Sequence, residues 1–270
     1  MKAGIYYNNN YLTENKLYID KIVPSLKKNN IDCLTVNNSS ELDGLDILFV
    51  LGGDGTILTV SAECARRGIK ILGINYGHMG FLTEFEPDKI DEAVKLVCNG
   101  NYSIQKRTML EVLCAGKRYI ALNDLVIQRS TGGRDFSNTV LLKAEIDGVT
   151  VDNYTSDGII ISTPTGSTAY SLSAGGSILT PDINAFIMTP ICAHSLHSRP
   201  VVYSDDSVLE VVQVNGNTPL NIIIDGKIVN VITDNEIIKI KKSEFYTEFI
   251  TRGNKNFFNK LLIKLNIWSK

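Results

Sequence analysis

The first hundred residues of the chain alternate short apolar segments with segments of helical composition. The apolar segments have the length and composition of buried strands, and the pattern predicts strands at residues 3–7, 32–36, 47–51 and 69–75. Helices are predicted at residues 13–29, 56–67 and 87–98, the first with a kink or an end at Pro24. Alternation of this kind indicates a doubly wound, mostly parallel α/β sheet.

The pattern changes near residue 101, where strand-like runs begin to follow one another with turn signals between them. Such runs predict an antiparallel β-rich domain. The end of the chain returns to helical spacing, with Phe257, Leu261, Leu265 and Trp268 on one face. The expected organisation is an α/β domain over residues 1–100, a β-rich domain over 101–250 and a terminal helix over 251–270.

The terminal helix allows two interpretations. Its apolar face favours packing against the protein core, and we favour this one. Its basic residues also fit an amphipathic helix that lies on a membrane surface. Those residues are Lys255, Lys260, Lys264 and Lys270.

Composition excludes several classes of protein. The net charge of −2 does not indicate a nucleic-acid-binding protein. Five scattered cysteines without a CxxC pair favour reduced thiols over a disulfide framework or a zinc site. The start of the sequence lacks the apolar region of a signal peptide, and no apolar run is as long as a membrane span. We therefore expect a cytoplasmic protein that binds neither membranes nor nucleic acid.

The sequence Gly52-Gly53-Asp54-Gly55-Thr56 follows the apolar strand at residues 47–51 and precedes a predicted helix. Ligands of open α/β sheets bind at such junctions, beyond the carboxyl ends of the strands. Glycines there let backbone N–H groups approach phosphate oxygens, and the start of a helix favours negative charge. A carboxylate among phosphates needs a chemical role, which would be to take a proton from an attacking hydroxyl. The alternative is that Asp54 caps the helix.

Other phosphate-binding loops are excluded by inspection. The chain has no GxxxxGK[ST] motif and no protein-kinase motifs, and the run from Gly73 to Gly80 has the wrong spacing for GxGxxG. His78, His194 and His197 lack the spacing of a metal site, so we expect no protein-built metal centre.

A second unusual segment covers residues 157–179. A predicted strand at residues 159–162 leads into a run of small and hydroxylated residues that ends at Tyr170. The N–H and hydroxyl groups of such a loop can surround a polar ligand, and a tyrosine ring can stack on it. Loops of this composition are also common without any ligand.

Together these motifs resemble those of the NAD kinase family. The matching segments are GGDGT, the run from Gly73 to Leu82, Asn123-Asp124, the STPTGSTAY run that follows Asp157, and TPIC at residues 189–192. They span roughly residues 47–227. GGDGT by itself also occurs in diacylglycerol and sphingosine kinases and in phosphofructokinases.

The resemblance implies transfer of the γ-phosphoryl group of ATP, or of polyphosphate, to the 2′-hydroxyl of the adenosine ribose of NAD, which gives NADP. It implies that Asp54 is the general base and that Gly52, Gly53, Gly55 and Thr56 form the loop that contacts phosphate. It also implies a set of dinucleotide-binding residues. They are Asn123, Asp124, Asp157, Thr168, Ala169, Tyr170, Ser171 and Ser173.

Three positions depart from the family pattern. Thr155 stands where relatives often have a basic residue, Lys227 stands where many have Gln, and Ala193 replaces a Pro. Thr155 and Lys227 remain candidate ligand contacts, and Asp225-Gly226 before Lys227 is expected to act chiefly as a turn. Arg134 aligns near a position that reaches the ligand in some relatives.

The resemblance also implies a terminal helix that packs back on the first domain, Mg²⁺ that arrives with ATP, and a homodimeric or homotetrameric assembly. Two alternatives stay open from the sequence. One is a lipid kinase of the GGDGT group, for which the basic terminal helix is the support. The other is a sensor that binds NAD or NADP without catalysis.

Overall fold

A computed structural model gives the structure of the chain. It describes residues 1–7, 12–75, 80–130, 139–214, 216, 218–233, 235–253 and 257–268. The chain divides into two compact units. Unit 1 joins Met1–Arg107 to Tyr246–Lys270, and unit 2 is Thr108–Phe245. The C-terminal segment thus returns to the unit that contains the N-terminus.

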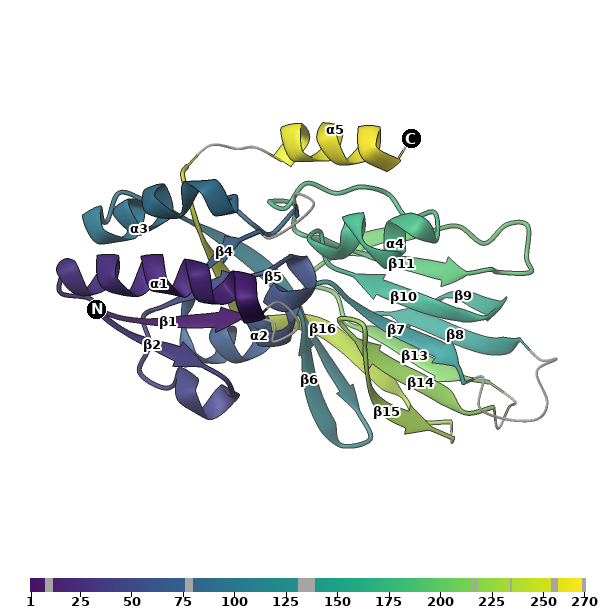
Figure 1. Cartoon of the computed structure of the whole chain (residues 1–270). Helices are drawn as coiled ribbons and strands as arrows, with labels where there is room; N and C mark the ends of the chain where they lie inside the picture. Colours follow the sequence, from purple (N-terminus) through teal and green to yellow (C-terminus); the bar gives the residue numbers. More distant parts are fainter. Residues whose placement is uncertain are drawn as a thin grey trace. The chain divides into compact units, whose positions relative to one another are not determined.

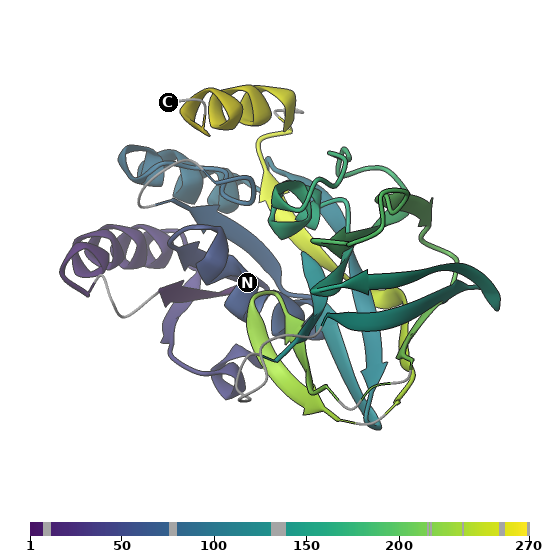
Figure 2. The ribbon, with the colours of Figure 1, turned by 90° about the vertical axis from the view of Figure 1, so that its right-hand side faces the viewer.

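Unit 1 contains the alternating elements (Figure 1). They are β1 (Lys2–Tyr7), α1 (Leu12–Lys28), β2 (Asp32–Val36), η2 (Ser39–Leu42), β3 (Ile47–Leu51), α2 (Asp54–Arg67), β4 (Lys70–Ile74), η3 (Pro87–Lys89), α3 (Ile90–Asn99) and α5 (Phe257–Trp268). Two strands run from one unit into the other, β5 (Ser103–Cys114) and β16 (Ile238–Thr251). Helix α5, yellow in Figure 2, follows β16 along the chain.

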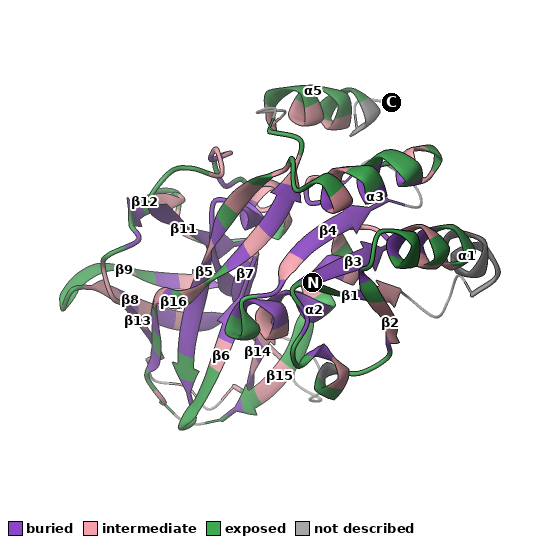
Figure 3. Ribbon diagram, turned by 90° about the vertical axis from the view of Figure 1, so that its left-hand side faces the viewer, coloured by how far each residue is buried: buried purple, intermediate pink, exposed green. Residues whose placement is uncertain are grey.

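The sheet of unit 1 is parallel, in the order β2-β1-β3-β4-β16, with Phe249 of β16 opposite Ile71 of β4. Helices α1 and α3 pack on one face through a shared core, and α2 packs on the other. Because both faces are covered, every residue of β3 is buried (Figure 3). The predicted doubly wound α/β arrangement is confirmed. One of the two alternatives for helix α1, an end at Pro24, is wrong, because the helix continues to Lys28.

Unit 2 is built from antiparallel strands. Its elements, which include two short helices, are β6 (Lys117–Ala121), β7 (Asp124–Arg129), β8 (Val140–Ile146), β9 (Val149–Ser156), β10 (Gly158–Ser162), η4 (Gly166–Thr168), α4 (Tyr170–Ser173), β11 (Ala185–Ile191), β12 (Val201–Ser204), β13 (Leu209–Gln213), β14 (Leu220–Ile224) and β15 (Lys227–Ile232). One sheet has the order β12-β11-β10-β7-β14-β15. The strands β16-β13-β8-β9, in this order, belong to the same hydrogen-bonded sheet as β2-β1-β3-β4. The predicted antiparallel β-rich part is likewise confirmed.

The inner faces of these two sheets share one apolar core, to which β7 and β10 contribute from one side and β8 and β13 from the other. Ile159 and Ile161 of β10 point into that core, while Ile160 lies on the opposite face beside Ala174, next to α4. Strand β10 is therefore buried throughout, and it carries the loop that begins at Thr163. The Asp147-Gly148 pair forms the predicted hairpin turn, with both residues at positive φ.

Phe186 offers a test of this core, since it is fully buried on β11 and meets Tyr203 edge-on at 6.0 Å. We expect Phe186→Ala to lower the free energy of unfolding by about 3–5 kcal/mol, because it removes apolar contacts and leaves a cavity. Urea unfolding followed by tyrosine and tryptophan fluorescence measures this loss. Val202→Ala, at a position 48% exposed on the neighbouring strand, is the control. Equal, small shifts in both variants would contradict the packing.

Candidate active site

The first residue of the loop after β3, Gly52, has a backbone conformation that only glycine adopts easily. Gly52 has φ of +149°, and its N–H donates to the carbonyl of Ile74 on β4 at 2.9 Å. A Cβ at Gly52 would lie 2.4 Å from Oγ1 of Thr56. The first glycine of the loop is therefore required by the turn itself.

Asp54 does not cap its own helix. Gly53 is the N-cap of α2 and Asp54 is the first helical residue, with no side-chain hydrogen bond at the cap. The Asp54 carboxylate accepts hydrogen bonds from the backbone N–H groups of Phe81 at 2.9 Å and Leu82 at 3.0 Å. The capping alternative is thus wrong, because the carboxylate binds another segment of the chain.

The segment that binds Asp54 needs glycines that our sequence analysis did not assign to the site. A Cβ at Gly80 would lie 2.1 Å from Oδ1 of Asp54. A Cβ at Gly73 on β4 would lie 3.1 Å from the Cα of Thr83 and 2.8 Å from Cδ1 of Ile57. The sequence signal was the glycine-rich run from Gly73 to Gly80, which lacks the GxGxxG spacing and matches the family pattern as part of the run from Gly73 to Leu82.

Gly55 and Thr56 follow Asp54 in the first turn of α2. Gly55 is exposed, and a Cβ there would meet no atom of the chain within 4 Å. Unlike Gly52, it is not demanded by packing within the chain. The space beside it is open to a ligand at a helix N-terminus, where phosphate groups bind favourably.

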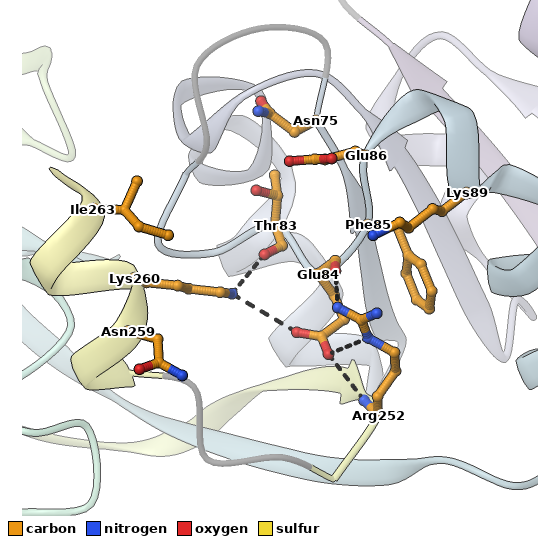
Figure 4. A pocket seen from close by; sticks show the side chains of 10 residues that line it. All are labelled: Asn75, Thr83, Glu84, Phe85, Glu86, Lys89, Arg252, Asn259, Lys260 and Ile263. Atoms are coloured by element: carbon orange, nitrogen blue, oxygen red, sulfur yellow. Dashed lines mark hydrogen bonds and ion pairs between the residues drawn. The ribbon is translucent and has the colours of Figure 1, made fainter. Parts of the chain in front are cut away.

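Helix α5 contributes a lysine to the same region (Figure 4). The Nζ of Lys260 donates to the carbonyl of Thr83 at 2.6 Å and to that of Phe81 at 3.4 Å, and it lies 3.7 Å from Oε2 of Glu84. Burial lowers the pKa of Lys260, and the Glu84 carboxylate opposes that shift. The sequence pattern indicates this lysine only as part of a basic helix face.

Lys260 also lines a cavity of about 220 Å³. Glu84 is nearly buried there and accepts hydrogen bonds from the backbone N–H and the Nε of Arg252 at 3.0 and 3.2 Å. The Arg252 guanidinium lies over the ring of Phe85 at 4.9 Å.

In unit 2, the backbone of residues 122–124 is held by Asp225. The Asp225 carboxylate accepts hydrogen bonds from the N–H groups of Leu122, Asn123 and Asp124 at 2.9, 2.7 and 3.2 Å. Asp225 has φ of +47° in the turn between β14 and β15, as expected for an Asp-Gly hairpin. Asp225 therefore makes the turn and also holds the strand end where Asn123 and Asp124 lie.

The loop after β10 holds the same backbone from its carbonyl side. The N–H of Thr163 donates to the carbonyl of Asn123 at 2.9 Å, and the Thr163 hydroxyl donates to that of Leu122 at 2.6 Å. A Cβ at Gly166 would lie 2.2 Å from the Asn123 carbonyl oxygen. Three motifs far apart in the sequence therefore meet at residues 122–124.

Asp124 is 5% exposed. Burial raises its pKa from 3.8 to about 7, and the nearby Asp225 carboxylate adds to the rise. Removal from water also raises the pKa of Asp225, which its hydrogen bonds from residues 122–124 and the charge of Lys227 counteract. The pKa of both carboxyl groups is thus raised, and that of Asp124 lies near neutral pH.

The remaining candidates in unit 2 fall into two groups. The Asp157 carboxylate pairs with Nε of Arg129 at 2.8 Å, and the carbonyl of Thr155 accepts from the N–H of His194 at 2.9 Å. In the loop after β10, the Ser171 hydroxyl is buried and bonds to that of Thr189 at 2.9 Å, whereas Tyr170 is 41% exposed.

The other loop candidates can be placed as well. Thr168 and Ala169 are half-buried at the end of η4, and Ser173 is exposed at the end of α4. Lys227 is exposed at the start of β15. Arg134 and His78 lie outside the described residues.

No group of three or more His, Cys, Asp or Glu side chains in the described part of the chain could hold a metal ion. No helix among the described residues combines the length and the apolar character of a membrane span.

Two protein-family models match the chain. The ATP-NAD kinase N-terminal domain matches residues 8–102, and the ATP-NAD kinase C-terminal domain matches residues 122–252. The NAD kinase of Caldanaerobacter subterraneus subsp. tengcongensis is 44% identical over 225 residues, which cover 82% of this chain and 78% of that protein. The NAD kinase of Chlorobium phaeobacteroides is 39% identical over 289 aligned residues, which cover 100% of this chain and 98% of that protein.

Solved structures show the same fold. The NAD kinase from Archaeoglobus fulgidus in complex with ATP has a TM-score of 0.80 and 28% identity, and the match covers 98% of this chain and 99% of that one. Yeast NADH kinase in complex with NADH has a TM-score of 0.87 and 23% identity, with 100% of this chain and 89% of that one covered. The yeast enzyme bears on the fold alone.

The raised pKa of Asp124 makes stability depend on pH. Its proton is bound more tightly in the folded chain than in the unfolded chain, so its contribution is full below pH 4 and is lost as pH rises through about 7. Between pH 5 and pH 8 we expect a loss of about 2–3 kcal/mol that is absent in Asp124→Asn. Urea unfolding at both pH values measures it.

The control for this prediction is Asp206→Asn, since the Asp206 side chain is 85% exposed. That variant should keep the pH dependence of the wild type. Equal pH dependence in the wild type and Asp124→Asn would contradict the assignment of this titration to Asp124.

Proposed function

The chain belongs to the ATP-NAD kinase family, and from this membership we infer that it transfers the γ-phosphoryl group of ATP to the 2′-hydroxyl of the adenosine ribose of NAD. The product is NADP. The observation in the chain itself that carries this inference is the Asp54 carboxylate at the first position of α2, next to the open space at Gly55.

Asp54 acts as the general base in this proposal. Its two oxygens each accept one backbone hydrogen bond, from Phe81 and Leu82, which fixes the plane of the carboxylate. A carboxylate oxygen can accept more than one hydrogen bond, so each retains the capacity to take a proton from a substrate hydroxyl. The proton leaves the 2′-hydroxyl as that oxygen attacks the γ-phosphorus, and ADP departs.

The loop of Gly52, Gly53, Gly55 and Thr56 contacts the phosphates of the donor in this proposal. The N–H groups at the start of α2 and the partial positive charge of that helix end suit phosphate oxygens. Mg²⁺ would come with ATP, bound by phosphate oxygens and water, and would neutralise charge on the transferred group.

Unit 2 binds the dinucleotide in this proposal. Asn123 and Asp124 lie on a backbone that Asp225 and Thr163 hold in place, and the exposed ring of Tyr170 is available for stacking. The other proposed contacts are Arg134, Thr155, Asp157, Thr168, Ala169, Ser171, Ser173 and Lys227. Since Asp157 is paired with Arg129, its contact with ligand would involve a carboxylate that is already partly neutralised.

The reaction demands little covalent chemistry from the protein. The transition state of phosphoryl transfer is loose, so alignment of the hydroxyl, the γ-phosphorus and the base carries most of the acceleration. The chain's own contribution is therefore rigid placement of Asp54 and of the phosphate loop.

The comparisons do not support the two alternatives, a lipid kinase and a non-catalytic sensor. ATP is the proposed donor, and polyphosphate is the alternative donor. A cytoplasmic location and a homodimeric or homotetrameric assembly are proposed on composition and family resemblance.

The first experiment measures NADP formation by the purified chain with NAD, ATP and Mg²⁺. We expect turnover in the wild type and a loss of about 10²–10⁴-fold in Asp54→Asn, because that variant keeps the shape of the side chain but lacks the base. Calorimetric titration should give similar NAD affinity for both proteins. Unchanged turnover in the variant would remove Asp54 from the role of base, and tight NAD binding without any turnover would favour the sensor.

Gly55→Ala tests the phosphate loop separately. Because a Cβ there meets no atom of the chain within 4 Å, we expect the free energy of unfolding to be unchanged or higher by about 0.5–1 kcal/mol. The methyl group would instead occupy space needed by phosphate, and KM for ATP should rise about tenfold, which is ~1.4 kcal/mol of binding. An unchanged KM for ATP would exclude close approach of the donor to Gly55.

A further inference from the structure

The segment that holds Asp54 is itself held from its other side by helix α5. The N–H groups of Phe81 and Leu82 donate to the Asp54 carboxylate, while the carbonyls of Phe81 and Thr83 accept from the Lys260 ammonium. The carbonyl of Phe81 and the N–H of Leu82 belong to one peptide group. That peptide group therefore has the Lys260 cation at its oxygen and the Asp54 anion at its N–H.

This arrangement is electrostatically favourable. A peptide group carries a dipole with its negative end at the carbonyl oxygen, and here a positive charge lies at that end and a negative charge at the other. Hydrogen bonds to charged groups are stronger than those between neutral groups. The two charges thus fix the orientation of the peptide group on which the Asp54 carboxylate depends.

Lys260 is placed for this task by its surroundings (Figure 4). Its side chain is 19% exposed, and its Nζ lies farther from the Glu84 carboxylate, at 3.7 Å, than from the Thr83 carbonyl, at 2.6 Å. Glu84 is occupied mainly by Arg252, whose backbone N–H and Nε both donate to Oε1. Lys260 therefore gives its shortest hydrogen bond to the backbone and not to the acid.

Helix α5 is also attached to this segment by ring contacts. The ring of Phe257 lies 6.1 Å from that of Phe81, and the ammonium of Lys264 lies 5.0 Å from the Phe81 ring centre. The helix thus contacts both the side chain and the backbone of Phe81. Among these contacts, the hydrogen bond from Lys260 to the Phe81 carbonyl, at 3.4 Å, reaches the peptide group whose N–H binds Asp54. The shorter hydrogen bond, at 2.6 Å, holds the carbonyl of Thr83 in the same segment.

We propose that Lys260 is a positioning residue for the phosphoryl transfer: from helix α5 it clamps residues 81–83 and so holds the Asp54 carboxylate in the orientation that catalysis requires. The proposal rests on the proposed function of Asp54. It assigns the terminal helix a part in turnover, through a backbone contact that needs a hydrogen-bonding cation and not one particular amino acid.

The test compares Lys260→Met, which removes the cation at similar length, with Lys260→Arg, which keeps it. In Lys260→Met we expect kcat to fall about 10- to 100-fold, as for a small misplacement of a reacting group, with KM for NAD and for ATP within twofold of the wild type. Lys260→Arg should recover most of kcat. Combined with Asp54→Asn, Lys260→Met should cause no further loss, because the lysine acts through the carboxylate.

Lys95→Met, at an exposed lysine of α3, is the matched control and should behave as the wild type. A second readout does not need turnover: hydrogen exchange in a peptide that covers residues 80–84 should be faster in Lys260→Met than in Lys95→Met, at equal melting temperature. If the wild type makes no NADP, the proposed function has failed, and this exchange measurement still decides whether Lys260 clamps the segment.

Three results would overturn the proposal. One is a kcat of Lys260→Met within twofold of the wild type. Another is a loss that is equally large in the Asp54→Asn background, or that appears only in KM for ATP, since the lysine would then act independently of Asp54 or bind the donor. The third is unchanged hydrogen exchange at residues 80–84.

Discussion

The organisation of unit 1 around its candidate site depends on one charge-assisted contact, between the Asp54 carboxylate and the backbone N–H groups of Phe81 and Leu82. A carboxylate in the first turn of a helix would ordinarily satisfy that helix's own N–H groups. Here it reaches a segment 27 residues later in the sequence. The contact exists because Gly80 leaves room for the carboxylate and Gly73 lets residues 82–83 lie directly on β4. The glycines thus allow an acid at the start of a helix to be held by the backbone of another segment.

Unit 2 contains the same kind of contact, a carboxylate that accepts hydrogen bonds from backbone N–H groups, but here the carboxylate is the supporting group. There a carboxylate, Asp225, lies in a hairpin turn and binds successive N–H groups of residues 122–124. The supporting acid is separate from the residues it presents, Asn123 and Asp124. In both units, backbone donors fix one carboxylate. Gly80 leaves room for the Asp54 carboxylate, whereas Gly166 lets the loop after β10 lie against the backbone of Asn123. Backbone groups make rigid partners, because their positions do not depend on side-chain rotamers.

Local patterns in the sequence were sufficient for the strands of unit 1, the change to antiparallel strands, and the Asp147-Gly148 turn, because each depends on neighbouring residues. Contacts between distant segments were not. Asp225 was expected to act chiefly in a turn, and its second role requires knowing that β14 pairs with β7. Lys260 gave only a basic, amphipathic pattern, since the carbonyls it binds have no sequence signature. Pro24 did not end α1, because tertiary packing of the helix, including Ile22 and Leu26 on its buried face, outweighs the lost hydrogen bond.

The Asp124–Asp225 pair lowers the stability of the fold at neutral pH, and this cost bears on the function of Asp124. Burial next to another carboxylate raises the pKa of Asp124 to about 7 and so reduces stability at neutral pH. An Asn at this position would avoid the cost and still offer an oxygen acceptor. A carboxyl group that titrates near 7 offers something an amide lacks: it donates one hydrogen bond when protonated and accepts only when ionised. Because strongly perturbed acids cluster where ligands bind, the raised pKa of Asp124 supports the proposed contact between this residue and a hydroxyl of the dinucleotide.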